Sequence, residues 1–160
     1  MRKLKLSDWA SIAELVSAIA VIISLLYVGI QVKENTNEIR AANRQQLVSR
    51  THTATQLVAA NPELAGIFTK IAEGTTLSAR EHVQFDYFVY GMLKDMEEGF
   101  LLYREGRLDE EYWQTRVAIT LNYLAQTPAR DVYRRRKKVG YFQTAFVKWL
   151  DQALNESDGG

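Results

Sequence analysis

The chain has 160 residues, enough for one domain with an appendage, and its 20 Lys and Arg residues nearly balance its 19 Asp and Glu residues. This balance provides no overall attraction to nucleic acid, so we do not expect a nucleic-acid partner. The absence of cysteine excludes disulfide bridges, thiolate metal ligands and a thiol nucleophile, and the two histidines leave little for a metal site.

The first predicted element is a transmembrane helix over residues 9–32. Between Glu14 and Lys33 lie 18 residues without a formal charge. With the residues before it, the apolar run would extend about 33 Å as a helix, enough for a hydrocarbon core of about 30 Å. Trp9 and Tyr27 suit the two membrane interfaces. The alternatives are a buried helix of an oligomer, or a signal peptide, which would have a shorter apolar region and a small-residue cleavage site.

Small residues follow one face of this helix. They are Ala10, Ala13, Ser17, Ala20 and Ser24, at intervals of 3, 4, 3 and 4. Small side chains let helix backbones approach closely in lipid, so we expect this seam to pack against copies of the same chain or against another membrane subunit. The alternative is a chance spacing, because Ala and Ser are common in membrane helices.

Basic residues flank the predicted membrane helix on both sides. A basic tail over residues 1–8 carries three of them, and residues 33–50 carry four. The preference of cytoplasmic loops for Lys and Arg therefore does not decide the orientation. Residues 33–60 are rich in Asn, Gln, Thr and Arg and have a thin apolar stripe, which predicts a juxtamembrane stalk helix whose distal end contacts a domain.

Residues 61–155 are predicted to form an all-α domain of about four or five antiparallel helices with short connections. Helix starts are predicted at Asn61, Ser78, Asp109 and Pro128. Gly74 and Gly106 are predicted helix ends. A stripe of Met and aromatic residues between positions 85 and 103 has helical spacing and is typical of a core face. Residues 156–160 are predicted to be a flexible tail.

A group of side chains in this domain is a candidate pocket for a small apolar ligand. The residues are Phe88, Met92, Trp113 and Tyr123. A sizeable cavity among them would support a ligand sensor, whereas tight packing would contradict it.

The basic run near the C-terminus is the sharpest local signal. It consists of Arg134, Arg135, Arg136, Lys137 and Lys138. Consecutive cations repel one another, which predicts a contact with anionic lipid headgroups or with an acidic partner. The alternative is a solvated face neutralised by acidic groups nearby in the sequence. RNA is disfavoured, because no recognition motif accompanies the run.

Acidic clusters lie at residues 95–98 and 109–111. We interpret the first as a source of structural ion pairs, for example Asp95 or Glu97 with a later arginine, and the second as favourable charge at a helix N-terminus. The sequence has no glycine-rich phosphate loop, dinucleotide fingerprint or Ser/His/Asp motif. We therefore predict no enzymatic activity, no catalytic residues, no metal and no cofactor.

The segments WASIAELVSAIAVIISLLYVGIQVKENTNEIRAAN and YREGRLDEEYW, followed by a final aromatic helix, resemble a family of small bacterial single-span membrane proteins with a C-terminal helical domain of unknown function. The resemblance covers nearly the whole chain. It implies a protein of the bacterial inner membrane, with the domain leaning towards the cytoplasm. It carries over no functional residues.

The leading hypothesis is a non-enzymatic single-span membrane protein that acts as an oligomeric scaffold or assembly module. One alternative is an accessory subunit of a larger membrane complex. Another is a membrane-anchored sensor of a small apolar ligand. A further alternative is a soluble, non-membrane regulator, which requires that the first segment is buried in protein.

Overall fold

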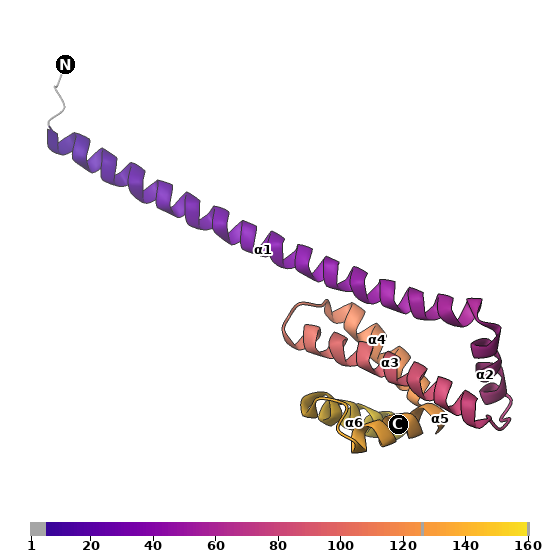
Figure 1. Cartoon of the computed structure of the whole chain (residues 1–160). Helices are drawn as coiled ribbons and strands as arrows, with labels where there is room; N and C mark the ends of the chain where they lie inside the picture. The colour runs from indigo at the N-terminus through magenta and orange to yellow at the C-terminus, as the bar shows by residue number, and fades with distance from the viewer. Residues whose placement is uncertain (1–5, 126, 160) are drawn as a thin grey trace. The chain divides into compact units, whose positions relative to one another are not determined.

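The computed structural model describes residues 6–125 and 127–159, and these residues form six helices without a strand (Figure 1). The helices are α1 (Leu6–Ala60), α2 (Pro62–Ala72), α3 (Ala79–Arg104), α4 (Glu110–Leu124), α5 (Thr127–Lys138) and α6 (Thr144–Asp158). The all-α prediction is confirmed. The helix α6 continues to Asp158, into the segment predicted to be a flexible tail. Residues 1–5 of the predicted basic tail lie outside the described residues.

The starts of α2 and α3 have the predicted caps. The Asn61 side chain accepts hydrogen bonds from the backbone N–H groups of Glu63 (3.0 Å) and Leu64 (3.2 Å), and Pro62 takes the first helical position. Ser78 and Glu81 form the reciprocal capping box. Local sequence therefore decides where these two helices begin.

The ends of α2 and α3 also follow the prediction. Gly74 and Gly106 both have a φ of 69°, in the left-handed region that side chains with a Cβ rarely adopt. At the start of α4, Asp109 takes the predicted cap position, but its side chain makes no capping hydrogen bond. Its carboxylate instead pairs with Arg44 of α1, at 3.3 Å.

The chain divides into two compact units, residues 1–39 and residues 40–160, within α1. In the first unit, all side chains described from Ile12 to Ile39 are exposed. This part of α1 is long and apolar enough to cross a membrane. The Ser24 hydroxyl donates a hydrogen bond to the carbonyl oxygen of Ala20 (2.9 Å), so the helix itself satisfies this polar group.

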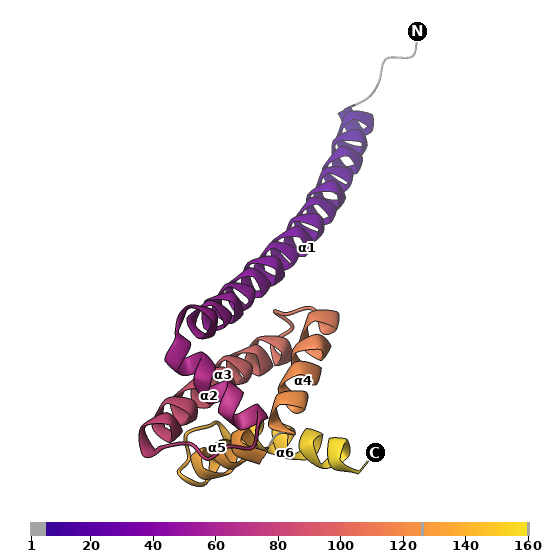
Figure 2. The same cartoon turned by 90° about the vertical axis from the view of Figure 1, so that its right-hand side faces the viewer.

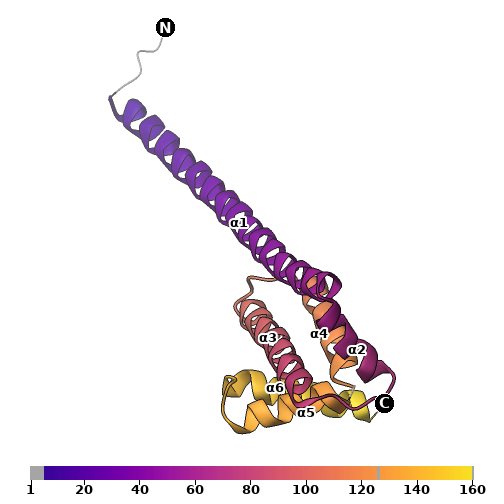
Figure 3. The same ribbon diagram turned by 45° about the vertical axis from the view of Figure 1, so that its right-hand side comes forward.

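In the second unit, α3 is the central helix and contacts α2, α4, α5 and α6 (Figures 2 and 3). Leu47, from the last part of α1, is only 1% exposed and belongs to the same core. The core is rich in aromatic rings: the ring centroid of Trp149 lies 5.0 Å from that of Trp113 and 5.2 Å from that of Phe100. The predicted stalk thus contributes its distal part to the folded domain.

Candidate apolar ligand cleft

A cleft of about 920 Å³ lies in the second unit, between the last part of α1, α3 and α4. Each helix lines it with residues that recur every three or four positions, which is one face of a helix. The stripes include Arg50, Ala54, Leu57 and Val58 on α1, Phe88, Gly91, Met92 and Asp95 on α3, and Arg116, Ile119 and Tyr123 on α4. Phe68 of α2 also lines it. The cleft therefore has apolar side chains along most of its length and charged ones at one end.

The three helices converge beyond the charged end of this cleft, at Gly99 of α3. A Cβ atom built on Gly99 would lie 3.3 Å from Arg116 Nε, 3.6 Å from the Trp113 ring and 3.9 Å from Leu47 Cδ1. The missing side chain lets α1 and α4 approach α3 closely here. A Cβ atom built on Gly91, two helical turns earlier, would meet no other atom within 4 Å. Neighbouring side chains thus pack against α3 at Gly99, whereas the space next to Gly91 is unoccupied.

Three of the four side chains predicted to form an apolar pocket line this cleft: Phe88, Met92 and Tyr123. The fourth, Trp113, does not line it. Trp113 is 2% exposed and stacks on Tyr103 with ring centroids 5.2 Å apart. Trp113 lies one turn before Arg116 on α4, on the closed side of the helix crossing, where the aromatic core leaves no space.

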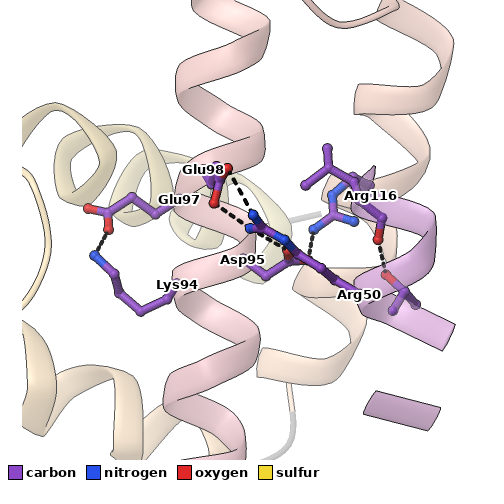
Figure 4. Close-up of polar contacts among 8 residues, drawn as sticks. Arg50, Lys94, Asp95, Glu97, Glu98 and Arg116 are labelled. Carbon is purple, nitrogen blue, oxygen red and sulfur yellow. Dashed lines mark hydrogen bonds and ion pairs between the residues drawn. The ribbon is translucent and has the colours of Figure 1, made fainter. Parts of the chain in front are cut away.

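The charged end of the cleft is held together by ion pairs (Figure 4). Arg50 of α1 pairs with Glu98 and lies 3.6 Å from Asp95, and Arg116 of α4 pairs with Asp95 at 2.5 Å. The hydrogen bond to Glu98 raises the pKa of Arg50 above its ordinary value, although desolvation opposes the shift. The pair between Asp95 and a later arginine confirms the structural role predicted for the first acidic cluster.

Some side chains that line the cleft carry a buried polar atom without a hydrogen-bond partner. In the part of the chain that the structure describes, four buried side-chain polar atoms lack a hydrogen-bond partner. Three of them, Asp95 Oδ1, Arg116 Nε and the Tyr123 hydroxyl, belong to side chains that line the cleft. Burial raises the pKa of Tyr123, so its hydroxyl keeps its proton at neutral pH. Buried polar atoms are normally hydrogen-bonded, and Asp95 Oδ1 has an ion-pair partner in Arg50 at 3.6 Å although no hydrogen bond forms.

Glu97 belongs to the same acidic cluster but points away from the cleft (Figure 4). It is 2% exposed, pairs with Lys94 and accepts a hydrogen bond from the backbone N–H of Gln143 at 2.5 Å. Gln143 is the residue before α6 and makes no capping bond with its own side chain. Glu97 therefore fixes the start of α6 against α3. Over the described residues, no group of three His, Cys, Asp or Glu side chains is arranged to hold a metal ion.

The basic run at the end of α5 is largely paired within the domain. Arg134 pairs with Asp131, Arg135 and Arg136 pair with Asp86, and Lys137 pairs with Asp151. None of these partners belongs to the acidic clusters at residues 95–98 and 109–111. Contact of the run with lipid or with an acidic partner stays a prediction, now with fewer free charges to support it.

Arg136 lies among three tyrosine rings and pairs with Asp86. The Arg136 guanidinium carbon lies 4.7 Å from the ring centroid of Tyr90 and 5.1 and 5.3 Å from those of Tyr87 and Tyr141. Burial opposes ionisation of Asp86, but hydrogen bonds from Arg135 and Arg136 outweigh it and hold the pKa of Asp86 below its ordinary value. These contacts join α5 to α3.

The small-residue seam lies in the first unit. Ala13, Ser17, Ala20 and Ser24 are all exposed, and the side chain of Ala10 lies outside the described residues. Packing of the seam against another helix stays a prediction.

Several residues that line the cleft were not among the predicted pocket residues. Leu57, Tyr87 and Ile119 are 54, 64 and 64% exposed, and they form an apolar border around the cleft. Their helical spacing is visible in the sequence, but it does not show which apolar residues are left uncovered. Gly91 offered a signal, because a glycine within an aromatic stripe leaves space on that face.

A scan against family models finds no match for this chain, and neither the curated proteins nor the solved structures provide one.

Proposed function

We propose that this chain is a non-enzymatic, membrane-anchored binding protein whose helical domain takes up a small apolar ligand in the cleft between α1, α3 and α4. The observation that carries the proposal is the cleft itself. Its volume of about 920 Å³ is in the range of small-molecule sites, roughly 300–1,000 Å³. Apolar walls with a few polar groups at one end are typical of such sites.

The physical driving force is the burial of apolar surface. Leu57, Tyr87 and Ile119 keep more than half of their surface exposed around the cleft. A ligand that covers them gains about 25 cal/mol for each Å² of apolar surface removed from water. The ion pairs of Arg50 with Glu98 and of Arg116 with Asp95 close the charged end of the cleft and orient the ligand.

The anchor in this proposal is the part of α1 from residue 12 to residue 32, whose exposed side chains are mainly apolar. A free helix surface of this kind suits lipid, because the hydrocarbon core solvates it without further partners. The resemblance of the sequence to small bacterial single-span proteins supports placement in a bacterial inner membrane.

The proposal is tested by photo-crosslinking of the full chain in lipid nanodiscs. A long-chain aliphatic probe carrying a diazirine should label peptides from residues 50–59, 87–98 and 116–123, and an unlabelled analogue should compete. Gly91→Leu fills the open part of the cleft and should abolish this labelling. Gly66→Leu is the matched control, because Gly66 is also helical with no atom within 4 Å of a built Cβ, yet it does not line the cleft.

Equal labelling in wild type and Gly91→Leu would contradict the proposal. So would labelling confined to residues 12–32, because that pattern reports only dissolution of the probe in the bilayer.

Assembly through α1 is a second candidate function. It is supported by the exposed surface of the first unit, on which Ala13, Ser17, Ala20 and Ser24 keep one face of the helix shallow. In this role the chain is an oligomeric scaffold, or an accessory subunit when the seam packs against a different membrane protein. The two functions are compatible, because they use different units of the chain.

A further inference from the structure

A second, smaller hollow adjoins the cleft. It has a volume of about 440 Å³ and lies between the end of α1, the start of α2 and the first part of α3. Leu57, Tyr87 and Phe88 line both the cleft and the hollow. Leu57 and Tyr87 are more than half exposed, so neither side chain belongs to a packed wall between the two spaces. The cleft and the hollow therefore form one groove.

The groove changes direction along its length. Helix α4 lines the cleft but not the hollow, whereas Asn61 and Leu64 line the hollow but not the cleft. Helix α1 ends at Ala60, and the extended backbone of Asn61 (φ −114°, ψ 99°) turns α2 away from the line of α1 (Figure 1). A flexible molecule can follow such a path, whereas a rigid ring system of the same length cannot.

The groove is also long. Its lining residues on α3 extend from Val83 to Glu98. At a rise of about 1.5 Å per residue, this part of the helix is about 22 Å long. A compact ligand in the cleft would leave the exposed side chain of Val83 in water, whereas an extended chain that continues into the hollow covers it. Covering additional apolar surface favours the longer ligand.

Charge is confined to one end of the groove. Arg50 pairs with Glu98 at the end of the cleft that lies away from the hollow, and the side chains of these two residues keep 40 and 43% of their surface exposed. None of the described side chains that line the hollow carries a formal charge: they are Leu57, Asn61, Leu64, Val83, Gln84, Tyr87 and Phe88. The apolar terminus of an amphiphile therefore suits the hollow, and its polar end suits the water-exposed charged end.

Building on the proposed function, we infer that the ligand is a flexible molecule with one long aliphatic chain, whose apolar terminus lies in the hollow beside Val83 and whose polar end lies beside Arg50 and Glu98. Single-chain lipids belong to this class. Sterols and other rigid polycyclic molecules do not.

The first test locates the two ends of the chain. Two hexadecyl alcohol probes carry a diazirine, one next to the hydroxyl group and the other next to the terminal methyl group. The full chain is reconstituted in phosphatidylcholine nanodiscs, and labelling of the nanodisc scaffold protein corrects for the concentration of each probe in the bilayer. The terminal diazirine should label residues 61–64 and 83–84. The diazirine next to the hydroxyl group should label residues 94–98 and 116.

Val83→Asp tests the hollow separately from the cleft. The concentration of hexadecyl probe needed for half-maximal labelling should rise at least about threefold, because the chain terminus would have to cover the new carboxylate. An octyl probe should change by less than about twofold, because its shorter chain makes its apolar contacts within the cleft. Val139→Asp is the matched control, because Val139 is also an exposed valine but lines neither space. Circular dichroism checks that both variants fold.

The outcomes separate the two proposals. Labelling of the cleft at the same residues by both hexadecyl probes overturns the inference and leaves the proposed ligand site standing. An equal response of the octyl and hexadecyl probes to Val83→Asp does the same, as does equal labelling of the hollow by a rigid sterol probe. Failure of every probe to label the groove overturns both proposals, and so does chemical cross-linking that places a helix of a second chain in it.

Discussion

Gly91 and Gly99 lie eight residues apart on α3, and their surroundings are opposite. Gly99 is buried where Arg116, Trp113 and Leu47 converge. Gly91 faces the open cleft. A glycine in a helix interior costs roughly 0.5–1 kcal/mol relative to alanine, so each position needs a separate explanation. For Gly99 that explanation is the close approach of the neighbouring helices. Gly91 leaves the space that we assign to the ligand.

Alanine substitution should separate the two positions. Gly91→Ala should raise the free energy of unfolding by about 0.5–1 kcal/mol, because the new methyl group meets no atom. Gly99→Ala should show no gain or a loss, because its methyl group would press against Arg116, which its ion pair with Asp95 holds in place. Chemical denaturation followed by near-ultraviolet circular dichroism measures both variants. A larger gain for Gly99→Ala would contradict the packing described here.

Glu97 should contribute more to stability than its neighbour Glu98. Glu97→Gln leaves a buried site with a weakened acceptor for the Gln143 N–H, and we expect a loss of about 1–3 kcal/mol in the free energy of unfolding. Glu98→Gln breaks an exposed pair with Arg50 and should cost about 0–1 kcal/mol. Hydrogen exchange at the start of α6 should accelerate in Glu97→Gln alone. Equal effects of the two substitutions would contradict the capping role.

At the scale of elements, ionised carboxylates connect neighbouring helices, and this makes their contacts sensitive to acid. Glu81 at the start of α3 accepts hydrogen bonds from Lys70 of α2 (2.6 Å) and from the Ser78 backbone N–H (2.8 Å). These hydrogen bonds, that of Lys70 above all, lower the pKa of Glu81 from 4.5 to about 2. Asp86 connects α3 to α5 in the same way.

The depressed pKa of Glu81 predicts the sign of the pH dependence. The folded state binds this proton more weakly than the unfolded state, so its stabilisation is fully present above pH 4.5 and is lost as the pH falls towards 2. Glu81→Gln should therefore show a shallower loss of stability over this interval than wild type. Thermal unfolding in a non-ionic detergent across a pH series measures the difference. Parallel pH curves for the two proteins would contradict the assigned hydrogen bonds.

The exposed apolar part of α1 is the basis for a prediction about assembly. A triple variant with leucine at Ala13, Ser17 and Ala20 has bulky side chains on the face that now carries small ones. Self-association should be disrupted, because the helix backbones can no longer approach closely. Membrane insertion should be unchanged, since leucine is at least as apolar as the residues it replaces. Cross-linking in native membranes measures assembly, and carbonate extraction checks insertion. Normal assembly of the triple variant would show that the small-residue seam is not the surface through which the chains associate.

At the scale of the whole chain, the two compact units carry different proposed roles, and ligand binding concerns only residues 40–160. A ligand that binds the folded domain and not the unfolded chain stabilises it by about 2.7 kcal/mol at 100 times its dissociation constant. A long-chain alcohol should therefore raise the unfolding temperature of the second unit in nanodiscs, and Gly91→Leu should remove the response. An equal rise in Gly91→Leu would show that the alcohol acts through the bilayer instead.

Much of this architecture could be predicted from local sequence. The cap at Asn61, the box at Ser78 and the positive φ at Gly74 and Gly106 depend on residues within a few positions of one another, so the helix boundaries follow from short-range chemistry. Phe88, Met92 and Tyr123 of the predicted pocket line the cleft because they share helix faces with other apolar residues. Trp113 lies in the core instead, and the sequence could not show this, since spacing along a helix does not reveal where a neighbouring helix crosses it.

The sequence by itself determined the all-α class, the starts and ends of α2 and α3, and the mainly apolar character of residues 12–32, because each depends on propensity, capping or hydropathy along a continuous segment. The tertiary structure alone decided which cations of the basic run are neutralised, which acidic residue of the 95–98 cluster is buried, and where the domain leaves space. Those outcomes depend on residues brought together from distant positions, such as Asp86 with Arg136 and Glu97 with Gln143. Pairing and packing across helices are properties of the fold, and no single segment encodes them.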